Sequence, residues 1–524
     1  MSSSVSPKPR PSNRRRTALL IGIGLLLGAL VTAGVAALLI NIFQHRVESQ
    51  NPYFRVVNID EKTFDPAVWG QNFPLQYDGW RKTAEMEPAD QVTRTPTADD
   101  PRTVKTHSKL EADPRLVTMW TGYAFAIEYN EPRGHMYMLE DQTLVKRVTQ
   151  FNQPGACLNC HSSIPEVLNN IGGDPAQAWA TMNKSPYSEV VGKANNHPVG
   201  CIDCHDPKTM ALRVTRPAFI NGMKALKNGQ GVKDYDVNSD ASAAEMRTFV
   251  CAQCHVEYYF AGDGKTLTFP WDNGLKIDDE FKYYNDHGFS DFTNTITGGP
   301  VVKAQHPDFE TFSQGVHASA GVTCADCHMA YKREGGQKIT DHQVRSPMIN
   351  DETINRSCLN CHRASEEEMR GRVKTIHDRY EEAKNKSFDA FMDLVHDIQA
   401  ARTNGTPANQ VTAAQLYARK ASFWIDYVVS ENSRGFHAPA YTIRILNDAT
   451  DASRKGQMSL RDAQYAQRAM TEPNLVPSPA PLGNKAPIAT PKPGATAATP
   501  GATPTYWKTA TANAATTPSP TPSR

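Results

Sequence analysis

The sequence has no cysteine outside one repeated pattern. Its ten cysteines all fall in five Cys-x-x-Cys-His motifs, whereas neither a disulfide scaffold nor a zinc ribbon needs a histidine after every second cysteine. A thioredoxin-like Cys-x-x-Cys would occur once, beside a strand–helix–strand pattern that this sequence lacks. The usual structural and redox roles of cysteine are therefore excluded.

The chain also lacks an excess of charge of either sign. Lysine and arginine number 56, and aspartate and glutamate number 55, whereas domains that bind nucleic acid are typically rich in basic residues. We therefore expect no nucleic acid among the partners of this protein.

The N-terminal region has no acidic residue but carries five basic ones within residues 1–16, and an uncharged run follows at residues 17–43. This run exceeds the ~20 residues that span a bilayer and the ~7–15 of a signal-peptide core. Because no small-x-small cleavage site follows, we favour an uncleaved single-pass transmembrane anchor over a long signal peptide. The basic flank predicts that residues 1–16 are cytoplasmic, and that the rest lies on the extracytoplasmic side (periplasmic or outer) of the cytoplasmic membrane.

Large apolar side chains are almost absent from the C-terminal end. Residues 472–524 consist mainly of Pro, Ala, Thr and Ser, and such a segment cannot bury enough surface to offset the entropy that ordering would cost. We predict a disordered tail there, which leaves residues 44–471 as the folded domain.

Each Cys-x-x-Cys-His motif is the attachment site of a c-type haem, because two thiols bond to the haem vinyl groups and the histidine ligates the iron from one face. Composition alone would start such a motif with a probability on the order of 10⁻⁵ at a given position, so chance does not explain five. We expect five haem c groups, and haem attachment outside the cytoplasmic membrane agrees with the predicted orientation. The motif residues are Cys157, Cys160 and His161; Cys201, Cys204 and His205; Cys251, Cys254 and His255; Cys324, Cys327 and His328; and Cys358, Cys361 and His362.

The predicted fold is mainly α, a multihaem cytochrome c fold with long C-terminal helices at about residues 365–432 and little β structure. Apolar residues recur there at steps of three and four, as on amphipathic helices. Thr406 is the expected N-cap of the second helix and Pro407 its first-turn proline. The apolar sides of these helices can pack within one chain or form a homodimer interface, and the pattern leaves both open.

Eleven histidines lie outside the motifs. A haem that transfers electrons usually takes a second axial ligand, whereas a catalytic haem leaves that position open. Residue types and spacing do not show which of these histidines are ligands.

Five further sequence blocks make the chain similar to pentahaem cytochrome c nitrite reductase, the ammonia-forming family, over roughly residues 115–440. The order of the haem motifs agrees as well. The blocks are Pro132-Arg-Gly-His135-Met-Tyr, Cys254-His-Val-Glu257-Tyr258-Tyr-Phe, Lys303-Ala-Gln305-His306-Pro, Asp341-His342 and Gly435-Phe-His437.

The resemblance implies a distal ligand for four of the haems and an open, catalytic iron on the fifth, at Cys157 and Cys160. It makes residues 44–471 a pentahaem catalytic domain. The implied distal ligands are His135 for the haem at Cys251 and Cys254, His342 for the haem at Cys201 and Cys204, His437 for the haem at Cys324 and Cys327, and His317 for the haem at Cys358 and Cys361.

The same resemblance implies that Arg147, Tyr258 and His306 surround the open iron. The expected reaction is NO₂⁻ + 6 e⁻ + 8 H⁺ → NH₄⁺ + 2 H₂O, with a cationic arginine for the anion and a histidine for proton supply. A calcium ion is expected beside the catalytic haem. Its implied ligands are Glu257, the Tyr258 carbonyl, the Lys303 carbonyl and Gln305, which are the oxygen donors that Ca²⁺ prefers.

One position departs from the common family pattern. Most members have lysine as the proximal ligand of the catalytic haem, whereas this chain has His161, as a minority do. The expected partners are nitrite, a quinol-oxidising membrane cytochrome or another electron donor, and a second copy of the chain. The alternatives are a pentahaem electron carrier without catalytic activity, or a related reductase of hydroxylamine, sulfite or tetrathionate.

Overall fold

The structure, a computed structural model, describes residues 14–50 and 55–479. Residues 1–13 of the predicted cytoplasmic segment, and residues 480–524 of the predicted disordered tail, lie outside the described residues. The chain divides into two units, residues 1–58 and residues 59–524.

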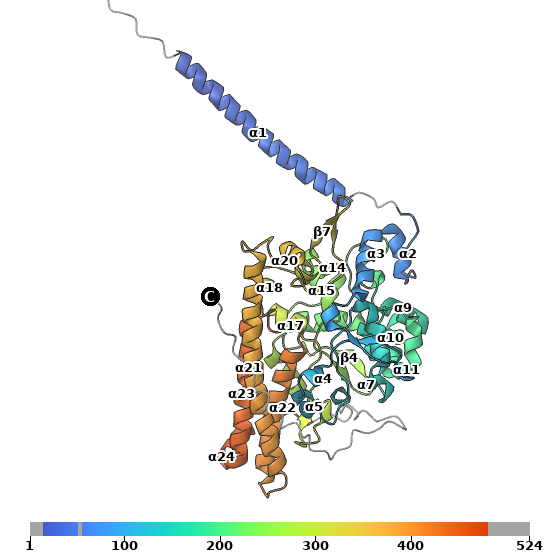
Figure 1. The fold of residues 1–524 in the computed structure, drawn as a ribbon, viewed down its shortest axis with the longest axis vertical. Helices are drawn as coiled ribbons and strands as arrows, with labels where there is room; N and C mark the ends of the chain where they lie inside the picture. Colours follow the sequence, from blue (N-terminus) through green and yellow to red (C-terminus); the bar gives the residue numbers. More distant parts are fainter. Residues whose placement is uncertain (1–13, 51–54, 480–524) are drawn as a thin grey trace, which may run out of the picture. The chain divides into compact units, whose positions relative to one another are not determined.

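The described part of the first unit is one long helix, α1 (Arg14–Gln50) (Figure 1). Its segment Thr17–Phe43 has a mean hydropathy of 2.5 and exposes its apolar side chains. Length and composition are therefore those of a membrane span or a signal sequence, as the uncharged run predicted.

The second unit is built from helices, with only two-stranded hairpins among its described residues. This architecture confirms the predicted mainly α fold with little β structure. The helices before the last haem motif are short: α2 (Pro66–Asn72), α3 (Pro74–Arg81), α4 (Lys109–Ala112), α5 (Arg115–Met119), α6 (Met138–Leu144), α7 (Lys146–Thr149), α8 (Leu158–His161), α9 (Ile164–Ile171), α10 (Pro175–Lys184), α11 (Tyr187–Val190), α12 (Cys201–Cys204), α13 (Pro217–Gly229), α14 (Val237–Asp240), α15 (Ala243–Ala252), α16 (Ile277–Asp286), α17 (Asp308–Ser313), α18 (Val316–Ser319), α19 (Cys324–His328) and α20 (Asp351–Ser357).

The four hairpins are all antiparallel and short. They pair β1 (Val92–Thr93) with β2 (Val104–Lys105), β3 (Tyr259–Ala261) with β4 (Thr266–Thr268), β5 (Phe292–Thr293) with β6 (Pro300–Val301), and β7 (Tyr331–Glu334) with β8 (Gln337–Thr340).

Three long helices, α21 (Glu366–Ala401), α22 (Ala408–Ser430) and α23 (Pro439–Arg461), pack side by side before the short α24 (Ala463–Ala469) (Figure 1). The first two confirm the predicted helical region, and α23 extends it beyond residue 432. The predicted cap was wrong. Pro407 is the N-cap of α22, and the Thr406 hydroxyl instead donates to Asn404 Oδ1 at 2.7 Å, in the preceding turn.

The apolar sides of the long helices are buried against one another within the chain. Phe391 of α21, Trp424 of α22 and Ile445 of α23 belong to one core and are at most 2 % exposed. The apolar residues that recur along these helices therefore pack within one chain. The fold also continues past the predicted boundary at residue 472, because Leu475 is fully buried and the Ser478 N–H donates to the Asn285 carbonyl.

Candidate haem-binding and active site

The haem motifs lie at the ends of short helices, which bring neighbouring motifs into contact. The thiol of Cys160 in the first motif interacts with that of Cys254 in the third. The thiol of Cys251 in the third motif interacts with that of Cys324 in the fourth. The first, third and fourth motifs therefore form a continuous series.

Four motif histidines each face a second histidine from elsewhere in the chain. The partners are the four that the family resemblance implied. The ring centroids are separated by 6.3 Å for His135 and His255, 6.4 Å for His205 and His342, 6.1 Å for His317 and His362, and 6.3 Å for His328 and His437.

This separation fits a metal ion held between two imidazoles. A metal–nitrogen bond of about 2.0 Å and a nitrogen about 1.1 Å from its ring centroid place two trans imidazole centroids roughly 6.3 Å apart. Burial lowers the pKa of His135, and likewise that of His342, to about 4. Both rings are therefore neutral at neutral pH, the form that ligates metals.

His161 of the first motif differs from the other four. Within residues 55–479, no second histidine ring stands opposite it at such a separation. Its Nδ1 lies 3.1 Å from the Met138 carbonyl oxygen, a contact that places the proton on Nδ1 and leaves Nε2 for iron. Burial, together with the charge of Arg147, lowers the pKa of His161 to about 4. The imidazole is thus a neutral ligand in the position where most family members have lysine.

Helix α6 holds both the proximal and the distal surroundings of this motif. Its Met138 carbonyl accepts from His161, and its Gln142 Oε1 accepts from Arg147 at 2.7 Å. The Arg147 guanidinium also lies 4.8 Å from the centre of the Phe125 ring. Arg147 therefore sits at a defined place beside the first motif.

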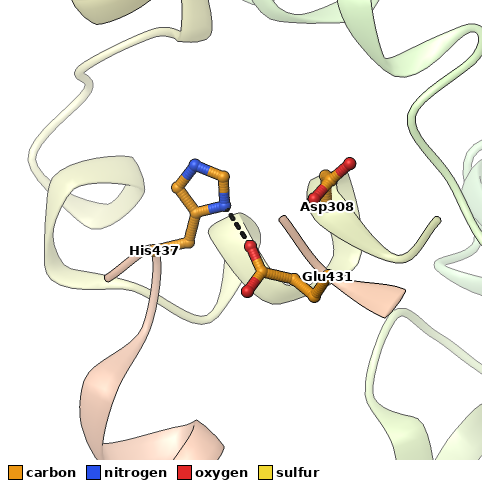
Figure 2. Close-up of side chains that lie close together, drawn as sticks. All are labelled: Asp308, Glu431 and His437. Atoms are coloured by element: carbon orange, nitrogen blue, oxygen red, sulfur yellow. Dashed lines mark ion pairs between the residues drawn. The ribbon is translucent and has the colours of Figure 1, made fainter. Parts of the chain in front are cut away.

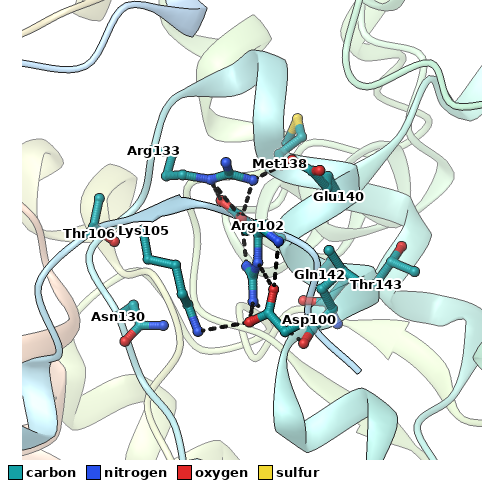
Figure 3. A network of polar contacts seen from close by, with 12 residues as sticks. Asp100, Arg102, Lys105, Thr106, Asn130, Arg133, Met138, Glu140, Gln142 and Thr143 are labelled. Carbon is teal, nitrogen blue, oxygen red and sulfur yellow. Dashed lines mark hydrogen bonds and ion pairs between the residues drawn. The ribbon is translucent and has the colours of Figure 1, made fainter. Parts of the chain in front are cut away.

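A network of ion pairs anchors α6 (Figure 3). Asp141 of this helix accepts from Arg102 at 2.8 Å and from Arg133 at 2.8 Å. Asp100 in turn accepts from Arg102 at 2.7 Å. Because the Arg102 and Arg133 side chains are only 4 % and 7 % exposed, breaking this network leaves buried charge without its partner.

The segments that carry Tyr258 and His306 are joined by backbone hydrogen bonds at the end of the third motif. The His306 N–H donates to the Val256 carbonyl, and the Phe309 N–H donates to the His255 carbonyl. Burial and the neighbouring Cys157 raise the pKa of Tyr258 well above its ordinary value, so its hydroxyl keeps its proton. Burial lowers the pKa of His306 to about 3, so its imidazole is neutral before an anion arrives.

The expected calcium ligands converge around Glu257, which is fully buried. Its Oε2 accepts from the Gln305 N–H at 2.6 Å, and the Gln305 amide donates to the Lys303 carbonyl at 3.2 Å. Burial raises the pKa of Glu257 well above its ordinary value. A carboxylate, a backbone carbonyl and a side-chain amide thus lie together in a region of low dielectric constant, which fits a hard cation.

Further buried carboxylates, which sequence reasoning missed, surround this region. Glu280 and Glu310 are fully buried, and three of their four oxygens have no hydrogen-bond partner among the described residues. The side chain of Lys303 does not offset them directly, because its Nζ pairs with Asp426 at 2.9 Å. Burial raises the pKa of Glu280 well above its ordinary value and that of Glu310 to about 8. This group of buried carboxyls without a cationic partner is a second observation that fits a bound cation. No sequence pattern indicates it, because the carboxylates are far apart along the chain.

Two other carboxylates missed from the sequence contact histidines that are expected to ligate haem. His255 Nδ1 lies 2.9 Å from Asp308 Oδ2, and His437 Nδ1 lies 2.6 Å from Glu431 Oε1. Figure 2 shows Asp308, Glu431 and His437 gathered in one place. Asp308 stands two residues after His306, and this spacing is the only sequence signal that it belongs near the site.

Comparison with known proteins yields consistent matches. The family model described as Cytochrome c552 matches residues 65–505. The chain is 36 % identical over 397 residues to cytochrome c-552 of Parabacteroides distasonis, covering 74 % of each chain. It is 35 % identical over 450 residues to cytochrome c-552 of Bacteroides fragilis, covering 83 % of this chain and 85 % of the relative.

Among solved structures, the fold matches cytochrome c nitrite reductase from Desulfovibrio desulfuricans, described as a catalytic subunit with two calcium sites. That match has a TM-score of 0.67 and 31 % sequence identity, and it covers 80 % of this chain and 90 % of the other.

Proposed function

This chain belongs to the cytochrome c552 family, and on that premise we propose how its residues carry out the six-electron reduction of nitrite. The protein is a multihaem cytochrome c oxidoreductase that reduces nitrite to ammonium. The observation that carries the proposal is the contrast between one motif histidine without an opposing histidine in residues 55–479 and four that have one.

Five haem c groups are proposed, one on each motif, with His135, His342, His437 and His317 as distal ligands of four. The paired ring separations of 6.1–6.4 Å support these assignments. When bound, the haem at Cys157 and Cys160 supplies an open iron that donates electron density to nitrite.

Arg147, Tyr258 and His306 are the proposed catalytic residues. Arg147 binds the anion, because a guanidinium keeps its positive charge and offers several N–H donors in one plane. Gln142 and Phe125 hold it in place. Tyr258, protonated in its buried position, donates a hydrogen bond that orients the substrate. Neutral His306 takes up a proton as negative charge enters the pocket and delivers it during N–O cleavage.

Calcium is proposed beside this pocket, with Glu257, the Tyr258 and Lys303 carbonyls, and Gln305 as ligands. The support is the meeting of Glu257, Gln305 and the Lys303 carbonyl in one buried place. Bound Ca²⁺ would hold the segments that carry Tyr258 and His306 together, because Tyr258 follows the ligand Glu257 in the sequence and His306 follows the ligand Gln305.

The remaining partners and the location are also proposals. Helix α1 is proposed to anchor the protein in the cytoplasmic membrane, with the catalytic domain outside, as the basic flank indicates. A quinol-oxidising membrane cytochrome is the proposed donor, and a homodimer the proposed assembly, both on the family resemblance. Because the apolar sides of α21 and α22 pack within the chain, a dimer would use other surface of the long helices.

The test is nitrite-dependent ammonium formation by the purified protein loaded with haem. We expect six electrons consumed from a reduced dye for each ammonium formed, together with one high-spin haem that binds cyanide. Ammonium formation from hydroxylamine but not from nitrite would favour the related-reductase alternative. A spectrum in which every haem is low-spin and inert to cyanide would favour the electron carrier.

A further inference from the structure

The imidazoles that ligate haem in this chain are held by two chemically different acceptors. Four of them approach backbone carbonyl oxygens: His161 Nδ1 at Met138, His205 at Met210, His328 at Arg345 and His342 at Thr340, with separations of 2.9–3.1 Å. His255 and His437 instead approach the carboxylates of Asp308 and Glu431. A carbonyl is neutral, whereas an ionised carboxylate adds a full negative charge beside the ring.

Asp308 is locked into this role by its other contacts. It is 8 % exposed, its Oδ1 accepts from the Asn432 N–H at 2.8 Å, and its Oδ2 accepts from the Asn432 amide at 3.0 Å. Asp308 thus receives the Asn432 N–H, the Asn432 amide and the His255 ring in its two carboxylate oxygens, and it contacts the proximal ligand of the third haem.

Glu431 lies beside the distal ligand of the fourth haem, with its Oε1 2.6 Å from His437 Nδ1. It is 3 % exposed, and its two oxygens accept from the Ser433 N–H at 3.0 Å and from the Ser433 hydroxyl at 2.9 Å. The Ser433 hydroxyl accepts from the His437 N–H at 2.9 Å. One oxygen from each carboxylate and a nitrogen of His437 lie within 4.8 Å of one another (Figure 2).

We propose that Asp308 and Glu431 are redox-tuning residues that lower the reduction potentials of the haems on the third and fourth motifs below those of haems whose ligands contact only carbonyls. Negative charge on a ligand imidazole makes it a stronger donor and stabilises ferric over ferrous iron. A buried site strengthens the effect, because little solvent screens the charge. The inference rests on the haem-ligand assignments proposed above.

The position of these two haems gives the tuning a consequence for electron delivery. Thiol contacts place the third motif between the first and the fourth, so the haem on the third motif adjoins the proposed catalytic haem. A low potential at the last relay before that haem makes electron transfer to it downhill. Asp308 also lies on the segment that carries His306, and so links the electron relay to the proton-supplying side of the pocket.

The test is a potentiometric titration of Asp308→Asn, Glu431→Gln and the double variant, followed by visible absorbance and electron paramagnetic resonance. Both changes remove charge and keep an acceptor of the same shape. In each single variant we expect the ferrous-to-ferric ratio of one low-spin haem, measured at a fixed potential, to increase at least tenfold. For a one-electron couple this increase corresponds to a rise of 59 mV in the reduction potential of that haem. The largest shift should fall on a different haem in each single variant, and the double variant should shift both haems.

The matched control is Glu381→Gln, which removes a carboxylate that pairs with Arg434 beside Glu431 and His437. We expect less than a threefold change in any haem of this variant. The proposal is overturned if neither single variant shifts a haem by threefold, or if the control shifts one as far. If Asp308→Asn fails to retain five haems, the result with Glu431→Gln decides. If the wild-type protein carries its haems but does not reduce nitrite, the proposed function is contradicted. The shifts in haem potential would still test this inference.

Discussion

Arg147 is the residue on which anion binding in the proposed pocket depends. Its short helix α7 (Lys146–Thr149) offers little rigidity, so its position comes from side-chain contacts. Gln142 accepts from one end of the guanidinium, and the Phe125 ring lies against its plane. A planar cation held in this way presents its remaining donors in one direction, which a flexible lysine would not do.

We therefore predict that Arg147→Ala lowers kcat/KM for nitrite by at least 100-fold, with all five haems retained. Arg147→Lys should recover part of this loss, because it restores the charge but not the planar set of donors. Steady-state kinetics and haem quantification provide the measurement. Arg372→Ala, at an arginine whose side chain is 54 % exposed on α21, is the control. Equal kinetics for Arg147→Ala and this control would remove Arg147 from the pocket.

The burial of Glu257 favours a bound cation beside its carboxylate. A carboxylate in a region of low dielectric constant is costly to ionise unless a cation or donors offset its charge. Tyr284 and the Gln305 N–H donate to it, but neither carries positive charge. Bound calcium would supply that charge.

We accordingly predict that removing calcium with a chelator lowers both nitrite turnover and the midpoint of thermal unfolding. Calcium should restore both, and magnesium should not, because Mg²⁺ demands shorter bonds and a stricter octahedral geometry. In Glu257→Gln the chelator should have no further effect. Calcium content, turnover and calorimetry give the measurements. A wild-type protein that keeps full activity with no calcium bound would contradict the site.

Helix α6 is the element that joins the two sides of the proposed catalytic haem. It is seven residues long, too short to be stable by itself, and its place depends on the hydrogen bonds that Asp141 accepts from Arg102 and Arg133. From this helix Met138 orients His161 and Gln142 orients Arg147. Ligand and substrate-binding residue therefore share one support.

We predict that Asp141→Asn destabilises the domain by about 1–3 kcal/mol, because two mostly buried guanidinium groups lose a shared negative charge. KM for nitrite should rise as Arg147 loses its fixed position. Denaturant unfolding and steady-state kinetics measure the two effects. Glu140→Gln is the comparison on the same helix. Glu140 also pairs with Arg133, but its side chain is 48 % exposed and Asp141 remains to offset the guanidinium, so this change should cost under about 0.5 kcal/mol. Equal effects of both changes would refute the role of α6.

At the scale of the whole molecule, the chain combines an apolar helix with a separate catalytic unit. Residues 59–479 contain every haem motif, every proposed distal ligand and the proposed calcium ligands. The helix α1 contributes none of them. The proposed membrane attachment and the proposed chemistry are thus carried by different parts of the sequence.

We predict that replacing residues 1–54 by a cleavable export signal yields a soluble protein whose kcat/KM for nitrite is within about twofold of the full-length value. Full-length protein should sediment with membranes and be released by detergent but not by high salt, because an apolar span inserts in the lipid core. Fractionation and nitrite assays measure this. Full-length protein found in the soluble fraction would show that the segment is a cleaved signal.

The sequence by itself determined the haem count that we expect, the mainly α class and the apolar N-terminal helix, because each is written in local spacing. The predicted cap at Thr406, the end of the fold at residue 471 and the missed α23 depended on weaker local signals. Residue blocks shared with a known family also pointed to the four histidine partners, which no spacing rule singles out.

Only the tertiary structure decided which polar groups contact those residues. Asp308 approaches His255 across 53 positions of the chain, and Trp120 reaches Asp426 across 306. Such contacts form because buried polar groups must find partners wherever packing brings them, and no local pattern records the choice. The acceptor behind each imidazole, and with it the tuning of each haem, is therefore a property of the folded chain.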